Sequence, residues 1–454
     1  MAGDCRKKIW KNRKDFLDLQ PNNKTVKTMQ KLTIYNFGPI KNAEFKFKKV
    51  NVLIGQQGAG KSCVLKIMAF CLWLEKISLS GEFTDLQRDM SQKEFVQKYL
   101  LEFYKLSDFV NYEEKFSKGK RDVDNGTISK YRIVSADNSE ISFDDNGNIK
   151  IFIKFKKDDE NWLNIVKIDV PQNSKHVAYI PAERCLVSAV PNLMDLKMQD
   201  TNIYKYLVDW EYAHKIYTEK NKLNILGLNA EFYYDEKTRT DYISVNDNGI
   251  TKKIKFTNAA SGFQSVVPIC VLINYYLGDN RILSIKEKQR IDELKELLKY
   301  YIGQENIADD LNDKINTIGK SRDYNIFLEE PEENIFPEVQ YRLMKFLFAT
   351  INNGYDNTLS IATHSPYTLT VLNNFIYAAK VGKINQGKVN EVIPEVLWQP
   401  TENVAAYYLN DGSATSIIDE ELGEIKAEMI DEVSRTINEE YDAIYNVEYE
   451  TKTA

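Results

Sequence analysis

Cysteine is scarce in this chain, and no part of it is apolar over a long stretch. The 454 residues include five cysteines, which are scattered and form no C-x-x-C pair. Neither a zinc site nor a disulfide framework is therefore indicated, and a reducing cytoplasm is the expected location. No run approaches the roughly 20 apolar residues of a membrane span. The N-terminus is polar and basic and lacks the apolar core of a signal peptide, so we expect a soluble cytoplasmic protein.

The net charge of −6 is distributed unevenly along the chain. Residues 1–31 contain nine Lys or Arg against three Asp, whereas residues 419–450 contain twelve Asp or Glu against two basic residues. We interpret both blocks first as solvated faces; the alternative is contact of the basic block with nucleic acid or an acidic protein surface. Residues 1–28 could also precede the natural start, because Met29 begins an ordinary leader into the first strand.

The strongest motif occupies residues 55–62 and reads G-x-x-x-x-G-K-S. It follows the apolar run at 50–54 and precedes an apolar helical pattern at 64–70. A strand, a glycine-rich loop and a helix in this order are the context that a phosphate-binding loop requires. A glycine turn that only opens a helix is the alternative. We predict that this chain binds a nucleoside triphosphate.

Each residue type in this loop has a defined task in phosphate binding. Backbone N–H groups close around phosphate oxygens, and the following helix adds the positive end of its dipole. Lys61 is expected to contact the β- and γ-phosphates, and the Ser62 hydroxyl is expected to hold Mg²⁺. The loop residues expected to line the nucleotide are Gly55, Gln56, Gln57, Gly58, Ala59, Gly60, Lys61 and Ser62.

Three further signals lie in the second half of the chain. An apolar strand at 324–328 ends in Glu329-Glu330-Pro331-Glu332, and another at 358–362 ends in Thr363-His364-Ser365-Pro366. The amphipathic helix expected at 337–352 separates them, so the two strands should be parallel, with their polar ends at the edge where α/β folds bind ligands. The third signal is Ser261-Gly262-Phe263-Gln264, which opens an apolar helix reaching Leu277.

These four motifs in this order resemble the head of ATP-binding-cassette proteins. The E-E-P-E sequence brings the resemblance closer to the SMC, RecF and OLD-type branch, and the stretch Y-I-P-A-E-R at 179–184 is similar to a motif of compact bacterial ATPases of this AAA group. The resemblance covers about residues 31–380. It implies an α/β fold, namely a P-loop ABC-type head with a mixed or parallel sheet and with β-rich and helical insertions.

The resemblance also implies a role for each matching residue. Glu330 would be the general base that orients the attacking water, and His364 would sense the γ-phosphate. Glu329, which stands where most relatives have Asp, would contact the metal together with Ser62. Ser261, Gly262 and Gln264 would belong to a signature that acts on the nucleotide of a second subunit.

Most of these residues also have a structural alternative. Glu329 and Glu330 could cap a turn, His364 could be a core histidine, and Ser261 could be an ordinary helix N-cap. Arg184 could be a salt-bridge partner or an arginine that contacts nucleotide or an interface. His176 and His214 are expected to be structural. Gln87 and Gln92 are the candidates for the lid glutamine of the family.

The expected organisation has three parts. A basic extension (1–30) precedes the ATPase head (31–380), which carries insertions at 86–175 and 279–320, and a β-hairpin with an acidic helix follows (381–454). Sustained heptads are missing between Lys61 and Ser261, so the long coiled-coil arms of chromosome-organising relatives are not expected. The roughly 75 residues after 380 are too few for the TOPRIM nuclease domain of OLD-type relatives.

The resemblance points to slow, Mg²⁺-dependent ATP hydrolysis that controls a nucleotide-sandwiched homodimer or larger even-numbered assembly. In compact relatives from bacterial anti-phage systems, such an ATPase acts as sensor or scaffold beside a separate effector such as a nuclease. That role is the leading hypothesis, and the alternative is a RecF-like DNA-repair ATPase that clamps DNA. A transporter subunit and a non-hydrolysing scaffold are weaker alternatives, because β-rich insertions and an intact Lys61 and Glu330 argue against them.

Overall fold

The computed structural model describes most of the chain between residues 30 and 426. The described residues are 30–79, 82–109, 139–144, 149–155, 161–167, 175–189, 199–247, 250–278, 323–353, 355–426 and 440. The basic extension up to residue 29, the expected insertion at 279–320 and nearly all of the acidic C-terminal helix lie outside them.

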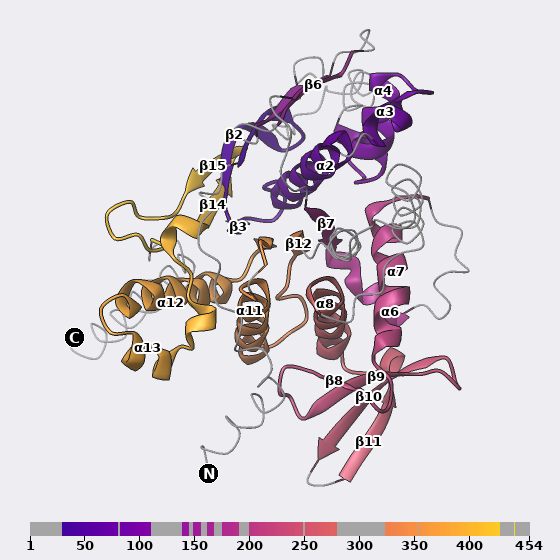
Figure 1. Cartoon of the computed structure of the whole chain (residues 1–454), viewed down its shortest axis with the longest axis vertical. Helices are drawn as coiled ribbons and strands as arrows, with labels where there is room; N and C mark the ends of the chain where they lie inside the picture. The colour runs from indigo at the N-terminus through magenta and orange to yellow at the C-terminus, as the bar shows by residue number, and fades with distance from the viewer. Residues whose placement is uncertain are drawn as a thin grey trace, which may run out of the picture.

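A six-stranded sheet in the order β15-β14-β3-β13-β12-β7 forms the centre of the molecule (Figure 1). Neighbouring strands from β14 to β7 are parallel, and β15 is antiparallel to β14. Every residue of β3, β12 and β13 is buried, as expected for strands written as unbroken apolar runs. The predicted α/β class and the parallel pairing of β12 with β13 are confirmed. The strands are β3 (Val50–Gly55), β7 (His176–Ile180), β12 (Tyr324–Glu329), β13 (Thr358–Thr363), β14 (Val404–Asn410) and β15 (Ser413–Ser416).

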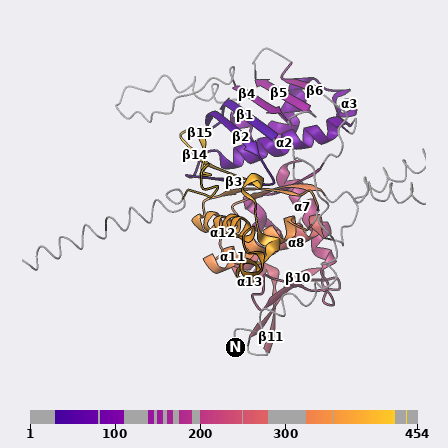
Figure 2. The ribbon, with the colours of Figure 1, turned by 60° about the vertical axis from the view of Figure 1, so that its left-hand side comes forward.

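Helices cover both faces of this sheet, because successive residues of each buried strand point to opposite sides. Leu53 belongs to the core shared with α2, whereas Val52 and Ile54 belong to the core shared with α8, α11 and α12. Figure 2 shows α2 on one side of the sheet and α8, α11 and α12 on the other. These helices are α2 (Lys61–Leu79), α8 (Ser261–Leu277), α11 (Pro337–Ile351) and α12 (Pro366–Gly382).

A second, antiparallel sheet in the order β2-β1-β4-β5-β6 covers the outer side of α2 (Figure 2). Its buried Leu32, Ile34, Ile141 and Ile151 alternate with exposed or half-buried residues and belong to the same core as α2. In this sheet β1 pairs antiparallel with β2, and β4 pairs antiparallel with β5. The strands are β1 (Gln30–Phe37), β2 (Ile40–Phe47), β4 (Ser139–Asp144), β5 (Ile149–Phe155) and β6 (Leu163–Lys167).

The third sheet, in the order β11-β10-β9-β8, lies beyond α7 at the opposite end of the molecule (Figure 1). The buried Trp210 of α7 stacks against Phe256 and contacts Phe232. His214 fits its expected structural role, because its ring stacks on Trp210 and its Nδ1 lies 2.8 Å from a carboxylate oxygen of Asp241. These elements are α7 (Asn202–Ala213), β8 (Leu223–Asn224), β9 (Ala230–Asp235), β10 (Thr240–Asp247) and β11 (Ile250–Lys255).

Short helical segments complete the described part of the chain. Ser91 and Glu94 form a reciprocal capping box at the start of α4, which fixes where that helix begins. Among the described residues, no helix combines the length and apolarity needed to cross a bilayer. The short segments include α3 (Glu82–Gln87), α4 (Gln92–Val96), a π-helical turn (Gln97–Glu102), 3₁₀ turns at Ala182–Cys185 and Phe256–Asn258, α6 (Leu186–Ala189) and α13 (Gln386–Val392).

The predicted C-terminal hairpin forms, and its first strand extends the central sheet. Asn410 pairs with Ser413 across the two residues Asp411 and Gly412, whose φ angles of 47° and 78° are typical of a type I′ turn. β14 also pairs in parallel with the whole of β3, from Val404↔Val50 to Leu409↔Gly55. Residues beyond 380 thus provide the strand on one side of the P-loop strand.

Gly55, the last residue of β3, pairs with Leu409 of β14. A β-carbon on Gly55 would lie 2.2 Å from the backbone carbonyl oxygen of Leu409, whereas one on Gly58 would have no neighbour within 4 Å. We expect Gly55→Ala to lower the free energy of unfolding by about 3 kcal/mol or more, because strand backbone must shift. Gly58→Ala, with a φ of +77° but free space, should lower it by about 1–2 kcal/mol. Urea unfolding of both variants tests this difference, and equal losses would contradict it.

Candidate functional site

The glycine-rich loop lies between β3 and α2, at the C-terminal edge of the parallel strands. Gly58 and Gly60 have φ angles of +77° and +97°, which only glycine adopts without cost. The Ala59 amide donates to the Gln56 carbonyl at 3.2 Å, and α2 begins directly at Lys61. Gln56, Gln57 and Gly58 are exposed. The predicted strand–loop–helix arrangement is therefore present, with a helix N-terminus facing the loop.

The Lys61 side chain is folded back onto this loop. Its Nζ donates to the carbonyls of Gly55 at 2.9 Å and of Gln56 at 3.0 Å, and the residue is only 5% exposed. Burial lowers the pKa of Lys61, while the carboxylates of Glu330 and Glu332 oppose this shift. A cation among N–H-rich loop residues at a helix N-terminus is suited to a phosphate group, so the residues present fit ATP.

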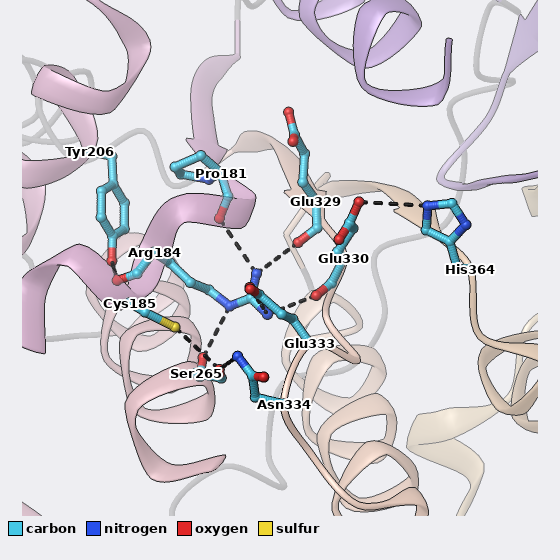
Figure 3. Close-up of polar contacts among 10 residues, drawn as sticks. All are labelled: Pro181, Arg184, Cys185, Tyr206, Ser265, Glu329, Glu330, Glu333, Asn334 and His364. Atoms are coloured by element: carbon cyan, nitrogen blue, oxygen red, sulfur yellow. Dashed lines mark hydrogen bonds and ion pairs between the residues drawn. The ribbon is translucent and has the colours of Figure 1, made fainter. Parts of the chain in front are cut away.

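His364 and Glu330 join the lysine at this edge of the sheet. The Nζ of Lys61 lies 3.5 Å from His364 Nδ1. On the other side of the ring, His364 Nε2 lies 3.6 Å from Glu330 Oε1, a contact drawn in Figure 3. An ammonium can only donate, so Nδ1 must be the acceptor, and the proton of the neutral imidazole then lies on Nε2, facing Glu330. The three residues follow β3, β13 and β12, as predicted for polar groups at the ends of parallel strands.

The backbone of Glu330 is in an unusual conformation. Its φ is +41°, in the left-handed region that non-glycine residues rarely adopt. Its N–H donates to the Ala362 carbonyl of β13 at 2.8 Å. The turn from β12 directs the half-exposed carboxylate towards His364 rather than along the strand (Figure 3). Strained residues of this kind cluster at functional sites.

Glu329, one residue earlier, is buried on the other side of the strand. The Tyr179 hydroxyl donates to Glu329 Oε1, and Lys66 Nζ lies 4.0 Å from the same oxygen. The Ser62 hydroxyl is also hydrogen-bonded to this carboxyl group. Burial raises the pKa of Glu329, against the opposing effects of Lys66, Tyr179 and Ser62. The structure thus brings Ser62 and Glu329 together, and a hydroxyl with a carboxylate is a donor set that fits Mg²⁺.

The signature residues lie apart from this cluster in the same chain. Ser261 is exposed and Gly262 half-buried at the start of α8. Gln264 Nε2 donates to the carbonyls of Phe256 at 3.3 Å and Thr257 at 3.0 Å, so its amide holds the preceding 3₁₀ turn. Among the described residues, no hydrogen bond links Ser261, Gly262 or Gln264 to the residues of the P-loop.

Arg184 is neither an exposed nucleotide contact nor mainly a salt-bridge partner. Its side chain is 0% exposed and donates to backbone carbonyls, including those of Glu329 and Glu330, while the nearest carboxylate, on Glu333, lies 3.6 Å away (Figure 3). Sequence reasoning considered a salt-bridge partner and a contact with nucleotide or an interface. It could not anticipate a buried side chain that donates to backbone carbonyls.

The candidates for a lid glutamine and the remaining histidine have other contacts. Gln92 Oε1 accepts from the Leu163 amide of β6 at 3.3 Å, which ties α4 to the outer sheet. Gln87 ends α3, and no hydrogen bond among the described residues connects its side chain to the P-loop. His176 stacks on Tyr324 and its Nδ1 lies 2.7 Å from Lys76 Nζ, as a structural residue would.

Sequence reasoning missed the residues that hold the site in place. Tyr179 and Lys66 flank Glu329, and Glu332 Oε1 accepts from the His364 backbone N–H at 2.5 Å. The Y-I-P-A-E-R stretch was the available signal for Tyr179, because β7 pairs Tyr179 with Phe327 of β12. The sequence signal for Lys66 was weaker, namely its position one turn after Ser62 on α2.

Comparison with known families agrees with this arrangement. The profile of the AAA domain matches residues 31–335, which is most of the described chain. The chain belongs to the AAA domain family. This confirms the AAA membership expected from the motifs. The matched part of this AAA protein ends before β13 and β14, the two strands that flank the P-loop strand. No curated protein matches the chain in sequence.

Solved structures similar to this AAA protein include heads of SMC proteins and RecF. The SMC head domain from Thermotoga maritima matches at 10% identity and a TM-score of 0.35, over 86% of this chain and 98% of that one. The SMC head from Pyrococcus furiosus bound to the C-terminal domain of ScpA matches at 10% identity and a TM-score of 0.31, over 86% and 95%. The recombination mediator RecF matches at 10% identity and a TM-score of 0.28, over 86% and 98%.

Proposed function

We propose that this AAA protein hydrolyses ATP with Mg²⁺ as its cofactor and that ATP controls the pairing of two copies. The observation that carries the proposal is the cluster of Lys61, His364 and Glu330 beside the P-loop. The His364 ring lies between the other two side chains, with Nδ1 3.5 Å from Lys61 Nζ and Nε2 3.6 Å from Glu330 Oε1. A cation for phosphate, a carboxylate and an imidazole at one helix N-terminus are the parts that phosphoryl transfer to water needs.

In this proposal the residues divide the work of hydrolysis. Lys61 and the loop N–H groups hold the phosphates, and Glu330 orients the attacking water and accepts its proton. His364 Nε2–H lies beside Glu330, where the attacking water would bind, and contacts the γ-phosphate. Ser62 and Glu329 would hold Mg²⁺, which neutralises the charge of the phosphate oxygens when it is bound. The Tyr179 hydroxyl holds the carboxylate of Glu329 by a hydrogen bond. This contact fixes a side chain that is one methylene longer than the Asp expected from the resemblance.

The signature residues support the pairing of two copies. Ser261 and Gly262 begin α8 with exposed or half-buried surfaces and are not tied to the loop of their own chain. Phe336, just after the Glu329–Asn334 segment, is 76% exposed, which supports an apolar contact on this side of the molecule. We propose that Ser261 and Gly262 contact the nucleotide held by the P-loop of the other copy.

Mixing two inactive variants tests this assignment. Lys61→Ala removes the phosphate cation, and Ser261→Asp repels phosphate while keeping a good first residue for α8. If Ser261 acts on the other copy, a mixed dimer has one site with both defects and one intact site. An equal mixture contains half mixed dimers, so it should recover about a quarter of wild-type hydrolysis.

Each variant alone should hydrolyse ATP at background rate, and phosphate release is the measurement. The control adds a Lys61→Ala, Ser261→Asp double variant to either single variant, which cannot restore an intact site. Absence of recovery in the mixture of single variants, with dimers present, would place Ser261 in the site of its own chain and remove the proposed exchange.

The wider role we propose is that of the ATPase sensor or scaffold of a bacterial defence complex with a separate effector. Its support is the combination of P-loop, Ser-Gly signature, E-E-P-E and T-H-S-P motifs in one compact chain. An ATP-driven change in pairing would expose or cover the surface on which the effector acts.

A further inference from the structure

Arg184 lies buried between the end of the catalytic strand β12 and the signature helix α8. It belongs to the 3₁₀ turn that follows β7, and its side chain has no exposed surface. Its own backbone carbonyl accepts from the Tyr206 hydroxyl at 2.7 Å, and Tyr206 is also fully buried. The turn that carries the guanidinium is therefore fixed from behind by α7.

The guanidinium donates mainly to neutral backbone carbonyls from two elements. Nη2 donates to the Glu330 carbonyl at 2.7 Å and Nη1 to the Glu329 carbonyl at 3.0 Å, while Nε donates to the Ser265 carbonyl at 3.1 Å. A weaker contact from Nη1 reaches the Pro181 carbonyl at 3.5 Å. A buried cation is costly unless its donors are satisfied. Here the planar fork connects the end of β12 with the first turns of α8 (Figure 3).

This contact completes the restraint on the Glu330 backbone. The Glu330 N–H is held by the Ala362 carbonyl, and its C=O is held by Arg184, so both polar groups of a residue with φ of +41° have fixed partners. Such a conformation costs on the order of 1–3 kcal/mol and persists only where surrounding groups determine it. Without the guanidinium, the peptide after Glu330 loses one of the two restraints that hold it there.

Two further contacts fix the other side of the link. The Cys185 Sγ lies 3.3 Å from the Ser265 Oγ, and Asn334 Nδ2 lies 3.5 Å from the same oxygen. Ser265 is fully buried, one turn after Ser261. The start of α8 is thus attached to the turn of Arg184 and to the segment that follows Glu330.

We infer that Arg184 is a positioning residue that holds Glu330 in its left-handed conformation and couples it to the signature helix. The inference rests on the proposed roles of Glu330 and Ser261. When the start of α8 meets the nucleotide of the second copy, Arg184 transmits that contact to the backbone of Glu330 in its own chain. Arginine is required because three donors in one plane must reach three carbonyls, and the ammonium of lysine cannot reproduce this fork.

Arg184→Lys tests the inference, because it keeps the charge and loses the fork. We expect kcat for ATP to fall roughly 10- to 100-fold, the scale of a misplaced catalytic group, while the Kd for Mg·ATP changes less than about threefold. In a Glu330→Gln background, the same substitution should weaken the ATP-dependent dimer at least about fivefold, measured by light scattering over a concentration series.

The matched control is Asn357→Ala at the opposite end of β12. Asn357 is fully buried and its side-chain oxygen accepts from the Tyr324 amide at 2.9 Å, so its loss destabilises the same strand away from the site. This control should lower Tm without lowering kcat of the folded protein. If Arg184→Lys does not fold, Tyr206→Phe replaces it as the test. This variant removes the hydrogen bond from the Tyr206 hydroxyl to the Arg184 carbonyl, and it should lower kcat about threefold or more with the Kd for Mg·ATP unchanged.

Three results would overturn the inference. The first is an Arg184→Lys enzyme with wild-type kcat. The second is a parallel loss of kcat and ATP affinity in Arg184→Lys that Asn357→Ala reproduces. The third applies where only Tyr206→Phe folds, and it is a wild-type kcat in that variant. An unaltered dimer in the Glu330→Gln background would remove the coupling to α8. Absence of hydrolysis by the wild-type protein is a separate outcome, since it refutes the proposed ATPase function.

Discussion

Replacing Glu330 with glutamine should lower the rate of ATP hydrolysis by at least about 100-fold while ATP remains bound. Glutamine preserves the size of the side chain and its reach towards His364, 3.6 Å away, but it cannot accept a proton from water. The phosphate cradle formed by Lys61 and the loop is unchanged. ATP that binds without being hydrolysed should hold two copies together, so the variant should form a stable, even-numbered assembly with Mg·ATP.

Phosphate release and light-scattering mass, each with and without Mg·ATP, measure the two parts of this expectation. The matched control is Glu338→Gln on α11, where the carboxylate is 57% exposed and pairs with Arg342 one turn later. That control should hydrolyse ATP like the wild type. Undiminished hydrolysis by the Glu330→Gln protein would refute the role of Glu330, and a monomer under every condition would refute the ATP-controlled pairing.

Replacing Lys61 with alanine should weaken the binding of Mg·ATP by roughly 100-fold or more. The change removes a buried cation that lies at the N-terminus of α2, and it leaves the Gly55 and Gln56 carbonyls without their donor. A charge-assisted hydrogen bond to phosphate contributes about 3 kcal/mol, which corresponds to about 100-fold in Kd. Lys61→Ala should therefore lose hydrolysis together with binding, whereas Glu330→Gln should lose hydrolysis and still bind ATP.

Calorimetric titration with Mg·ATP measures this affinity, and Lys205→Ala on the exposed face of α7 is the matched control. The same pair tests the wider role in cells that carry the chain with its neighbouring genes. Lys61→Ala should abolish any protection against phage that the control variant retains. Full protection by Lys61→Ala would exclude a need for ATP binding in the proposed defence role.

Local patterns were sufficient to predict the elements that form the candidate site. The P-loop depends on neighbouring residues alone, because glycine spacing and the flanking apolar runs determine a strand, a loop and a helix. The ends of β12 and β13 were likewise predictable, since Glu330 and His364 directly follow unbroken apolar runs. Asp411 and Gly412 indicated the tight hairpin turn for the same reason.

Other parts of the site could not be predicted from local pattern. The pairing of β14 with β3 joins segments far apart in the chain, and no residue in either strand specifies its neighbour. Arg184 contacts backbone carbonyls, which every residue possesses, so its partners leave no trace in the sequence. The hydrogen bond from Tyr179 to Glu329 depends in turn on β7 lying beside β12.

The place of β14 also determines when the nucleotide site can exist during synthesis. The backbone N–H of Lys46 in β2 donates to the Tyr407 hydroxyl of β14, 361 positions later in the chain. A ribosome releases β3 and its P-loop early, and β3 then keeps an open edge of unpaired backbone groups until β14 emerges. We therefore expect the sheet around the P-loop to be completed only after β14 has emerged, and a chain cut before residue 404 lacks the strand against which Gly55 packs.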